Sequence, residues 1–130
     1  MIYILDDEKD LLVSMCKRVQ LRGFQVTGFE SAPPAIQAIS SSNSKCEMIL
    51  VDYTMPGSPQ SGGQKLWQEL KTLSPAPLYV MSGYGQGNPE IEKLLASGKV
   101  SGIFYKPVPL DELILTIESL GIQKNPPPKS

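Results

Sequence analysis

The sequence contains no histidine and only two cysteines, Cys16 and Cys46. The lack of histidine excludes an imidazole-dependent catalytic triad, an imidazole-bound zinc site and a phosphohistidine carried by this chain. The two cysteines permit at most one disulfide and form no Cys-x-x-Cys pair, so a disulfide scaffold is also excluded. We therefore expect reduced thiols and a cytoplasmic location.

Long apolar runs and an excess of positive charge are also missing. No run approaches the roughly 20 apolar residues that a membrane-spanning helix needs, and the start of the chain lacks the pattern of a secretory signal. The 12 basic and 13 acidic residues give a formal net charge of −1, which argues against non-specific nucleic-acid binding. The length of 130 residues is typical of one domain. We expect no membrane segment and no direct contact with nucleic acid.

Short apolar runs alternate with helical patterns along the chain. Four runs show no polar alternation, which is typical of strands buried on both faces, namely residues 2–5, 48–51, 78–81 and 103–105. A fifth run, residues 24–29, alternates and predicts a half-exposed edge strand. Helical patterns follow the strands over residues 8–21, 33–40, 63–73, 89–97 and 110–120. This alternation predicts a doubly wound α/β fold with a parallel sheet.

Polar side chains stand at the carboxyl ends of four predicted strands. Asp6 and Asp7 follow the first run, Asp52 the third, Ser82 the fourth and Lys106 the fifth. Ligands of open α/β sheets bind outside these strand ends. Clustered carboxylates repel one another unless a cation joins them, and Mg²⁺ prefers oxygen ligands. An aspartate can attack phosphorus, and Mg²⁺ with a lysine can neutralise the transferring phosphoryl group.

Each of these residues has a commoner structural explanation when it is taken alone. An acidic pair after a strand is more often a helix cap, and Asp52 or Ser82 would usually be a turn residue. A lysine at position 106 would usually be solvated. The convergence of all of them at one edge of the sheet favours a shared phosphoryl-transfer site.

Four segments together resemble the receiver domain of two-component response regulators and hybrid histidine kinases. They are Ile-Leu-Asp-Asp-Glu at 4–8, Val-Asp-Tyr-Thr-Met-Pro-Gly at 51–57, Met-Ser-Gly-Tyr at 81–84 and Tyr-Lys-Pro at 105–107. The resemblance covers residues 1–121 and implies a flavodoxin-like sheet of five parallel strands in the order 2-1-3-4-5, with five helices. Residues 122–130 contain three consecutive prolines and are predicted to be a disordered tail or linker.

The resemblance implies a phosphoacceptor with a metal site. Asp52 corresponds to the residue that takes a phosphoryl group from a histidine kinase or phosphotransfer protein. Asp6, Asp7, Asp52 and the backbone carbonyl of Thr54 would hold Mg²⁺, or Mn²⁺ in its place. Such a domain is not an enzyme, although Mg²⁺-dependent self-phosphorylation from a small phosphodonor and slow autodephosphorylation are expected. The missing histidine fits this role, because an acceptor needs its donor on another chain or domain.

The resemblance also implies a switch. Ser82 corresponds to the hydroxyl that turns toward the phosphoryl group, and Lys106 to the lysine that pairs with it, with a cis bond to the following proline. The face formed by the fourth helix, fifth strand and fifth helix would engage an output partner, and the chain would be a monomer or weak homodimer. The usual aromatic switch position, three residues before the lysine, is Ile103 here. Tyr84 or Tyr105 is a candidate substitute.

Other functions share parts of this pattern. A pseudo-receiver would be an interaction module that never carries phosphate, and Ile103 keeps that alternative open. An aspartyl-phosphate phosphatase would place its nucleophile after the first strand and a second aspartate two residues later, where this chain has Thr54 after Asp52. A flavodoxin-like nucleotide binder would need a phosphate-cradling loop where Asp6 and Asp7 stand. Both a free single-domain regulator and a receiver from a longer protein fit the sequence.

Overall fold

Five parallel strands form one sheet in the order β2-β1-β3-β4-β5, as the resemblance implied. The strands are β1 (Ile2–Leu5), β2 (Val26–Phe29), β3 (Met48–Asp52), β4 (Leu78–Ser82) and β5 (Gly102–Tyr105). We describe a computed structural model over residues 1–41, 45–55, 64–85 and 87–124. Residues 57–63, whose glycine, serine, proline and glutamine content favours a loop, and most of the predicted tail, 125–130, lie outside the described residues.

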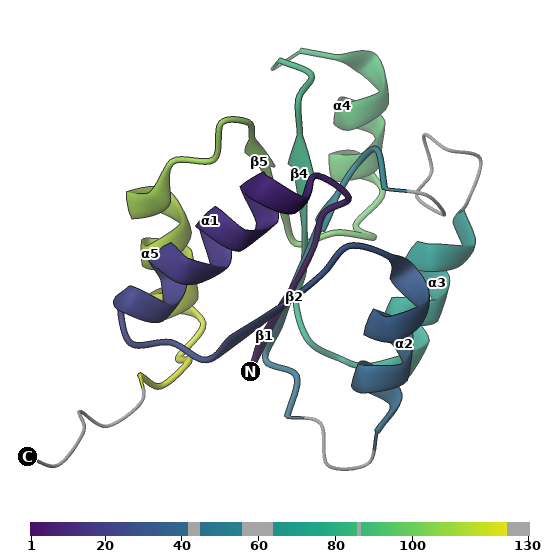
Figure 1. Ribbon diagram of the computed structural model, residues 1–130. Helices are drawn as coiled ribbons and strands as arrows, with labels where there is room; N and C mark the ends of the chain where they lie inside the picture. Colours follow the sequence, from purple (N-terminus) through teal and green to yellow (C-terminus); the bar gives the residue numbers. More distant parts are fainter. Residues whose placement is uncertain (42–44, 56–63, 86, 125–130) are drawn as a thin grey trace, which may run out of the picture.

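A helix follows each strand and covers one face of the sheet. The helices are α1 (Lys9–Leu21), α2 (Ala32–Ser40), α3 (Gln64–Leu73), α4 (Pro89–Ala96) and α5 (Leu110–Ser119). Figure 1 shows α1 and α5 on one side of the sheet and α2, α3 and α4 on the other. This three-layer arrangement is the predicted doubly wound fold.

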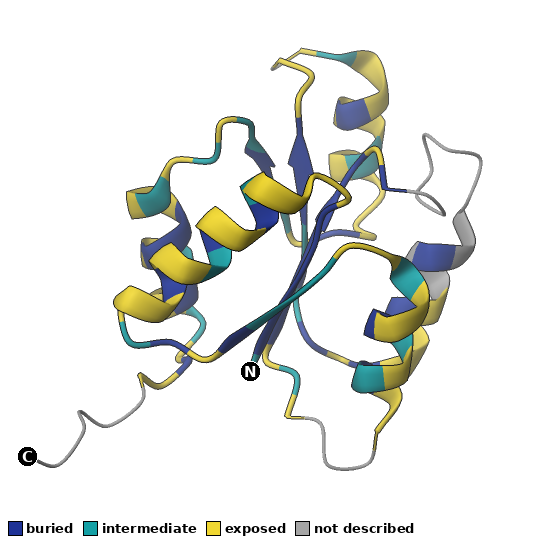
Figure 2. Ribbon diagram, viewed as in Figure 1, coloured by how far each residue is buried: buried dark blue, intermediate teal, exposed yellow. Residues whose placement is uncertain are grey.

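Two apolar cores lie on the two faces of the sheet. Val19 of α1 and Ile117 of α5 pack in the first core, while Leu70 of α3 and Ile91 of α4 pack in the second. Every residue of β1 and β3 is buried, as Figure 2 shows. Strands buried on both faces have no solvent side, which explains why their sequences show no polar alternation. Ile122, just after the predicted domain boundary, is also buried in the first core.

The two edge strands differ from their predicted forms. Strand β2 is the expected half-exposed edge strand, but it begins at Val26, because the N–H of Phe24 bonds to the carbonyl of Val19 at the end of α1. The prediction that 103–105 is buried on both faces is wrong. Strand β5 is the opposite edge and pairs only with β4, and within it only Phe104 is buried.

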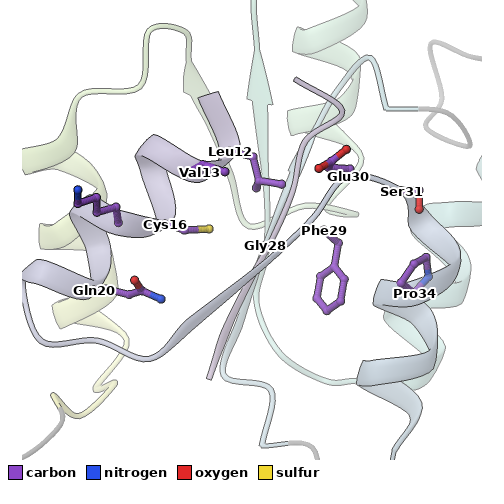
Figure 3. A pocket seen from close by; sticks show the side chains of 10 residues that line it. Leu12, Val13, Cys16, Gln20, Gly28, Phe29, Glu30, Ser31 and Pro34 are labelled. Carbon is purple, nitrogen blue, oxygen red and sulfur yellow. The ribbon is translucent and has the colours of Figure 1, made fainter. Parts of the chain in front are cut away.

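A glycine on β2 allows α1 to pack closely against the strand. Gly28 lies on β2 beneath Leu12 and Cys16 of α1, and these residues with Phe29 and Pro34 line a groove that crosses the outer edge of β2 (Figure 3). A Cβ at position 28 would stand 2.8 Å from the Sγ of Cys16 and 2.9 Å from a methyl carbon of Leu12. A side chain at position 28 would therefore force Leu12 and Cys16 to move and disturb the packing of α1 on the strand.

We therefore expect Gly28→Ala to destabilise the protein by about 1–3 kcal/mol, the range typical of overpacked cores. Urea denaturation followed by far-UV circular dichroism would measure the loss. Gly85→Ala is the matched control, because no heavy atom lies within 4 Å of a Cβ built there. Equal stabilities of the two variants would show that α1 does not pack on Gly28 as described.

Candidate functional site

The carboxyl ends of the central strands place the predicted side chains together. Asp52 is the last residue of β3 and Ser82 the last of β4, while Asp6 and Lys106 directly follow β1 and β5. The backbone ladder extends to both flanking residues. The N–H of Asp6 donates to the carbonyl of Phe29 at 3.0 Å, and that of Lys106 to the carbonyl of Ser82 at 2.7 Å. The convergence that strand topology predicted is therefore present.

Lys106 bridges two buried carboxylates. Its Nζ lies 3.1 Å from Oδ2 of Asp6 and 3.3 Å from Oδ1 of Asp52, whose side chains are 1% and 2% exposed. Burial raises the pKa of Asp6, although the Glu8 backbone N–H and Lys106 oppose that rise. Burial alone would lower the pKa of Lys106, but its bonds and attraction to Asp6 and Asp52 outweigh burial and raise it. The lysine is therefore held charged between two carboxylates. The bond from Lys106 to Pro107 is cis, as expected.

Asp6, Asp7 and Asp52 form a cluster that fits a hard divalent cation. Each offers a carboxylate oxygen, and these oxygens lie within 4.8 Å of one another. Asp7 is exposed while the other two are buried, so the cluster opens toward solvent on one side. Lys106 supplies one positive charge against three negative ones, which leaves a net negative site. Oxygen donors with uncompensated negative charge are the ligands that Mg²⁺ prefers.

Thr54 contacts Asp52 in a way that the sequence did not reveal. Its hydroxyl donates to Oδ2 of Asp52 at 2.9 Å, and its backbone N–H lies 3.4 Å from Oδ1. The sequence interpretation had assigned only its backbone carbonyl. Together with Lys106 on Oδ1, these contacts fix the orientation of the Asp52 carboxylate.

The Ser82 hydroxyl is engaged by the turn that follows β4. It is fully buried, accepts a hydrogen bond from the N–H of Tyr84 at 3.0 Å and donates to the carbonyl of Tyr84 at 3.4 Å. Ser82 therefore lies at the predicted edge of the sheet, and its hydroxyl is bonded to Tyr84 in the turn after β4.

A tyrosine next to Asp52 reaches helix α4. The side chain of Tyr53 is 3% exposed, and its hydroxyl donates to Oε2 of Glu90 at 3.1 Å. Glu90 lies in the first turn of α4, where the side chain of Asn88 caps the helix by accepting a hydrogen bond from the backbone N–H of Glu90. The ring of Tyr84 meets that of Tyr53 edge to face, with centroids 6.0 Å apart. The sequence pattern assigns Tyr53 no role, because its partner Glu90 lies 37 positions away along the chain.

The Tyr53 hydroxyl predicts a loss of stability at alkaline pH. Burial first, and then Glu90, raise its pKa to about 12 from the ordinary value of 10.0. Between these values the unfolded chain releases a proton that the folded chain keeps, so stability falls as pH rises through this range. We expect Tyr53→Phe to lose less stability than the parent chain between pH 10 and 12 in urea denaturation. Tyr79→Phe keeps the Tyr53–Glu90 pair and should follow the parent, whereas parallel curves for all three proteins would contradict the assignment.

Comparisons with known proteins agree with this geometry. A family model described as the response regulator receiver domain matches residues 2–118. The transcriptional regulatory protein FixJ of Bradyrhizobium diazoefficiens is 30% identical over 132 residues, which cover 99% of this chain and 60% of FixJ. The response regulator protein TodT of Pseudomonas putida is 30% identical over 119 residues, which cover 91% of this chain and 49% of TodT. This chain thus spans about half the length of these relatives.

Solved structures share the fold. A response regulator receiver domain protein from Clostridium thermocellum superposes with a TM-score of 0.75 at 19% identity, covering 92% of this chain and 91% of that one. A response regulator from Burkholderia pseudomallei, determined with a phosphorylated aspartic acid, calcium ion and citrate, gives 0.70 at 21% identity and covers 87% and 63%. Among the described residues, no helix is both long and apolar enough to cross a bilayer.

Proposed function

Because this chain belongs to the response regulator receiver domain family, we propose that it is a phosphoacceptor switch of a two-component phosphorelay. The phosphoryl group would pass to Asp52 from the phosphohistidine of a partner kinase or phosphotransfer protein. One observation carries the proposal, namely the buried Asp52 carboxylate held between Lys106 and Thr54 beside Asp6 and Asp7. The solved relative with a phosphorylated aspartic acid supports the same chemistry.

The residues divide the work of the transfer. An oxygen of Asp52 forms a bond to phosphorus while the bond between phosphorus and the donor nitrogen breaks, and that nitrogen keeps the electron pair. Lys106 remains charged beside Asp52 and pairs with a phosphoryl oxygen, and Ser82 donates a hydrogen bond to another. Asp6, Asp7, Asp52 and the Thr54 carbonyl would hold Mg²⁺ or Mn²⁺, which supplies further positive charge to the transferring group.

The chain would act through partners rather than as an enzyme. Receiver domains interact with histidine kinases and with output domains. Of the relatives, FixJ is a transcriptional regulatory protein and TodT a response regulator protein. We propose self-phosphorylation from small phosphodonors, slow autodephosphorylation, and output through the face of α4, β5 and α5. Leu95 of α4 and Leu115 of α5 are exposed apolar side chains. The chain itself would contact no nucleic acid and would be a monomer or weak homodimer. Free Cys16 and Cys46 suit a reducing cytoplasm.

The test is whether the folded chain gains one phosphoryl group from acetyl phosphate only when Mg²⁺ is present. Asp7→Asn removes the exposed carboxylate of the cluster and should raise the Mg²⁺ concentration for half-maximal phosphorylation by about tenfold or more. Intact mass measured over a Mg²⁺ titration would give both results. No phosphoryl adduct in folded protein at saturating Mg²⁺ would contradict the proposal and leave an interaction module that carries no phosphate.

A further inference from the structure

The single proton of the Ser82 hydroxyl links the phosphoryl site to Tyr84. A hydroxyl has one proton to donate, and that proton is now directed to the carbonyl of Tyr84 across 3.4 Å. This distance exceeds the usual range for a hydroxyl donor, so the bond is weak. An anionic phosphoryl oxygen on Asp52 is a stronger acceptor. Donation to it requires Ser82 to give up the carbonyl of Tyr84.

Tyr84 in turn contacts a chain of groups that reaches α4. Its ring packs edge to face on Tyr53, at an interplanar angle of 84°, and the Tyr53 hydroxyl is bonded to Glu90 in the first turn of α4. Tyr53 is also the residue that directly follows Asp52. The chain neighbours of Asp52 and Ser82 therefore form one aromatic pair, Tyr53 with Tyr84, and this pair is bonded to α4 through Glu90.

The usual aromatic switch position of receiver domains does not connect Ser82 to α4 in this chain. Ile103 is a partly buried aliphatic residue packed in the second core. Tyr105 lies opposite Ser82 in the β4–β5 register and is also partly buried in that core. Among these three candidates, it is Tyr84 whose backbone N–H and carbonyl bond to the Ser82 hydroxyl and whose ring contacts Tyr53, which leads to α4.

We propose that Tyr84 is the positioning residue that couples Ser82 to helix α4, through the ring of Tyr53 and the Tyr53–Glu90 hydrogen bond. This inference rests on the proposed function, because it needs a phosphoryl group or its mimic at Asp52. When Ser82 turns to that group, the turn at Tyr84 loosens and its ring moves from Tyr53. The Tyr53–Glu90 bond then becomes open to water, and the first turn of α4 is released.

Hydrogen exchange of α4 tests the coupling, with beryllofluoride and Mg²⁺ as the phosphoryl mimic. We expect the amides of α4 in the parent chain to exchange about tenfold faster with the mimic bound, as the loss of a hydrogen bond to a charged group implies. Tyr84 is 40% exposed, so Tyr84→Leu should fold and still bind the mimic, but its α4 exchange should not change on binding. Tyr105→Leu is the matched control and should respond like the parent.

A second pair of variants separates the tether from general packing. Glu90→Ala should give fast α4 exchange with and without the mimic, and Glu90→Gln, which keeps an acceptor for Tyr53, should restore the response. A parent-like response in Tyr84→Leu, or its loss only in Tyr105→Leu, would overturn the coupling while leaving phosphorylation of Asp52 intact. Failure of the parent chain to bind the mimic would instead count against the proposed function, and the coupling would fall with it.

Discussion

The substitution Asp52→Asn should abolish phosphorylation of this chain. The amide lacks the nucleophilic carboxylate oxygen, and removal of a nucleophile typically lowers such rates by at least about a thousandfold. Asp52 is the buried carboxylate that Lys106 and Thr54 hold in place, so no other residue of the cluster has the same environment. Asp6 would remain paired with Lys106 in this variant, and the fold should therefore persist.

Intact mass after incubation with acetyl phosphate and Mg²⁺ measures this effect as the loss of an adduct of about 80 Da, the added phosphoryl group. Asp111→Asn makes the same chemical change on α5, where the side chain is 88% exposed, and should leave the adduct unchanged. Circular dichroism would show that Asp52→Asn is folded. An adduct of undiminished amount on folded Asp52→Asn would mean that the phosphoryl group is carried elsewhere.

The substitution Lys106→Met should destabilise the protein by about 3–5 kcal/mol at neutral pH, the usual cost of leaving buried charges without their partner. The variant keeps most of the side-chain volume but removes the ammonium group. Asp6 and Asp52, which are nearly inaccessible to solvent, would then repel each other without compensation. Added Mg²⁺ should restore part of the loss, because a cation in the cluster replaces the missing positive charge.

Urea denaturation of Lys106→Met and Lys99→Met would measure the difference, since Lys99 is exposed. The pKa of Lys106 is raised above its ordinary value of 10.5 in the folded chain. Its contribution to the free energy of unfolding is therefore complete below pH 10.5, and it is lost as the pH rises through the higher pKa of the folded chain. The gap between the parent and Lys106→Met should accordingly close only at strongly alkaline pH. A loss as small as that of Lys99→Met at neutral pH would contradict the role of Lys106 as a buried counter-ion.

The position of the site followed from the sequence because strand direction alone determines it. Apolar runs identified the strands, and in a parallel sheet every residue that follows a strand lies at the same edge. Asp6, Asp52, Ser82 and Lys106 needed no knowledge of side-chain conformation to be brought together. The Asn88 cap with Pro89 was likewise predictable, since both residues act within one turn of the chain.

Contacts between side chains from distant segments were not predictable in the same way. The Tyr53–Glu90 bond joins residues 37 positions apart, and it depends on how α4 packs rather than on any local pattern. The choice of the Thr54 hydroxyl as a donor to Asp52 depends on a side-chain rotamer. The exposure of β5 was mispredicted because an apolar run does not reveal whether its strand has a neighbour on both sides.

The most direct test of the central claim is to locate the phosphoryl group in the unmodified chain. After incubation with acetyl phosphate and Mg²⁺, borohydride reduction converts an acyl phosphate into a stable alcohol, and peptide mass spectrometry identifies the reduced residue. We predict that Asp52 is reduced, and that chelation of Mg²⁺ before incubation prevents it. Reduction at another residue, or none at Asp52 while Mg²⁺ is present and the chain is folded, would contradict the account.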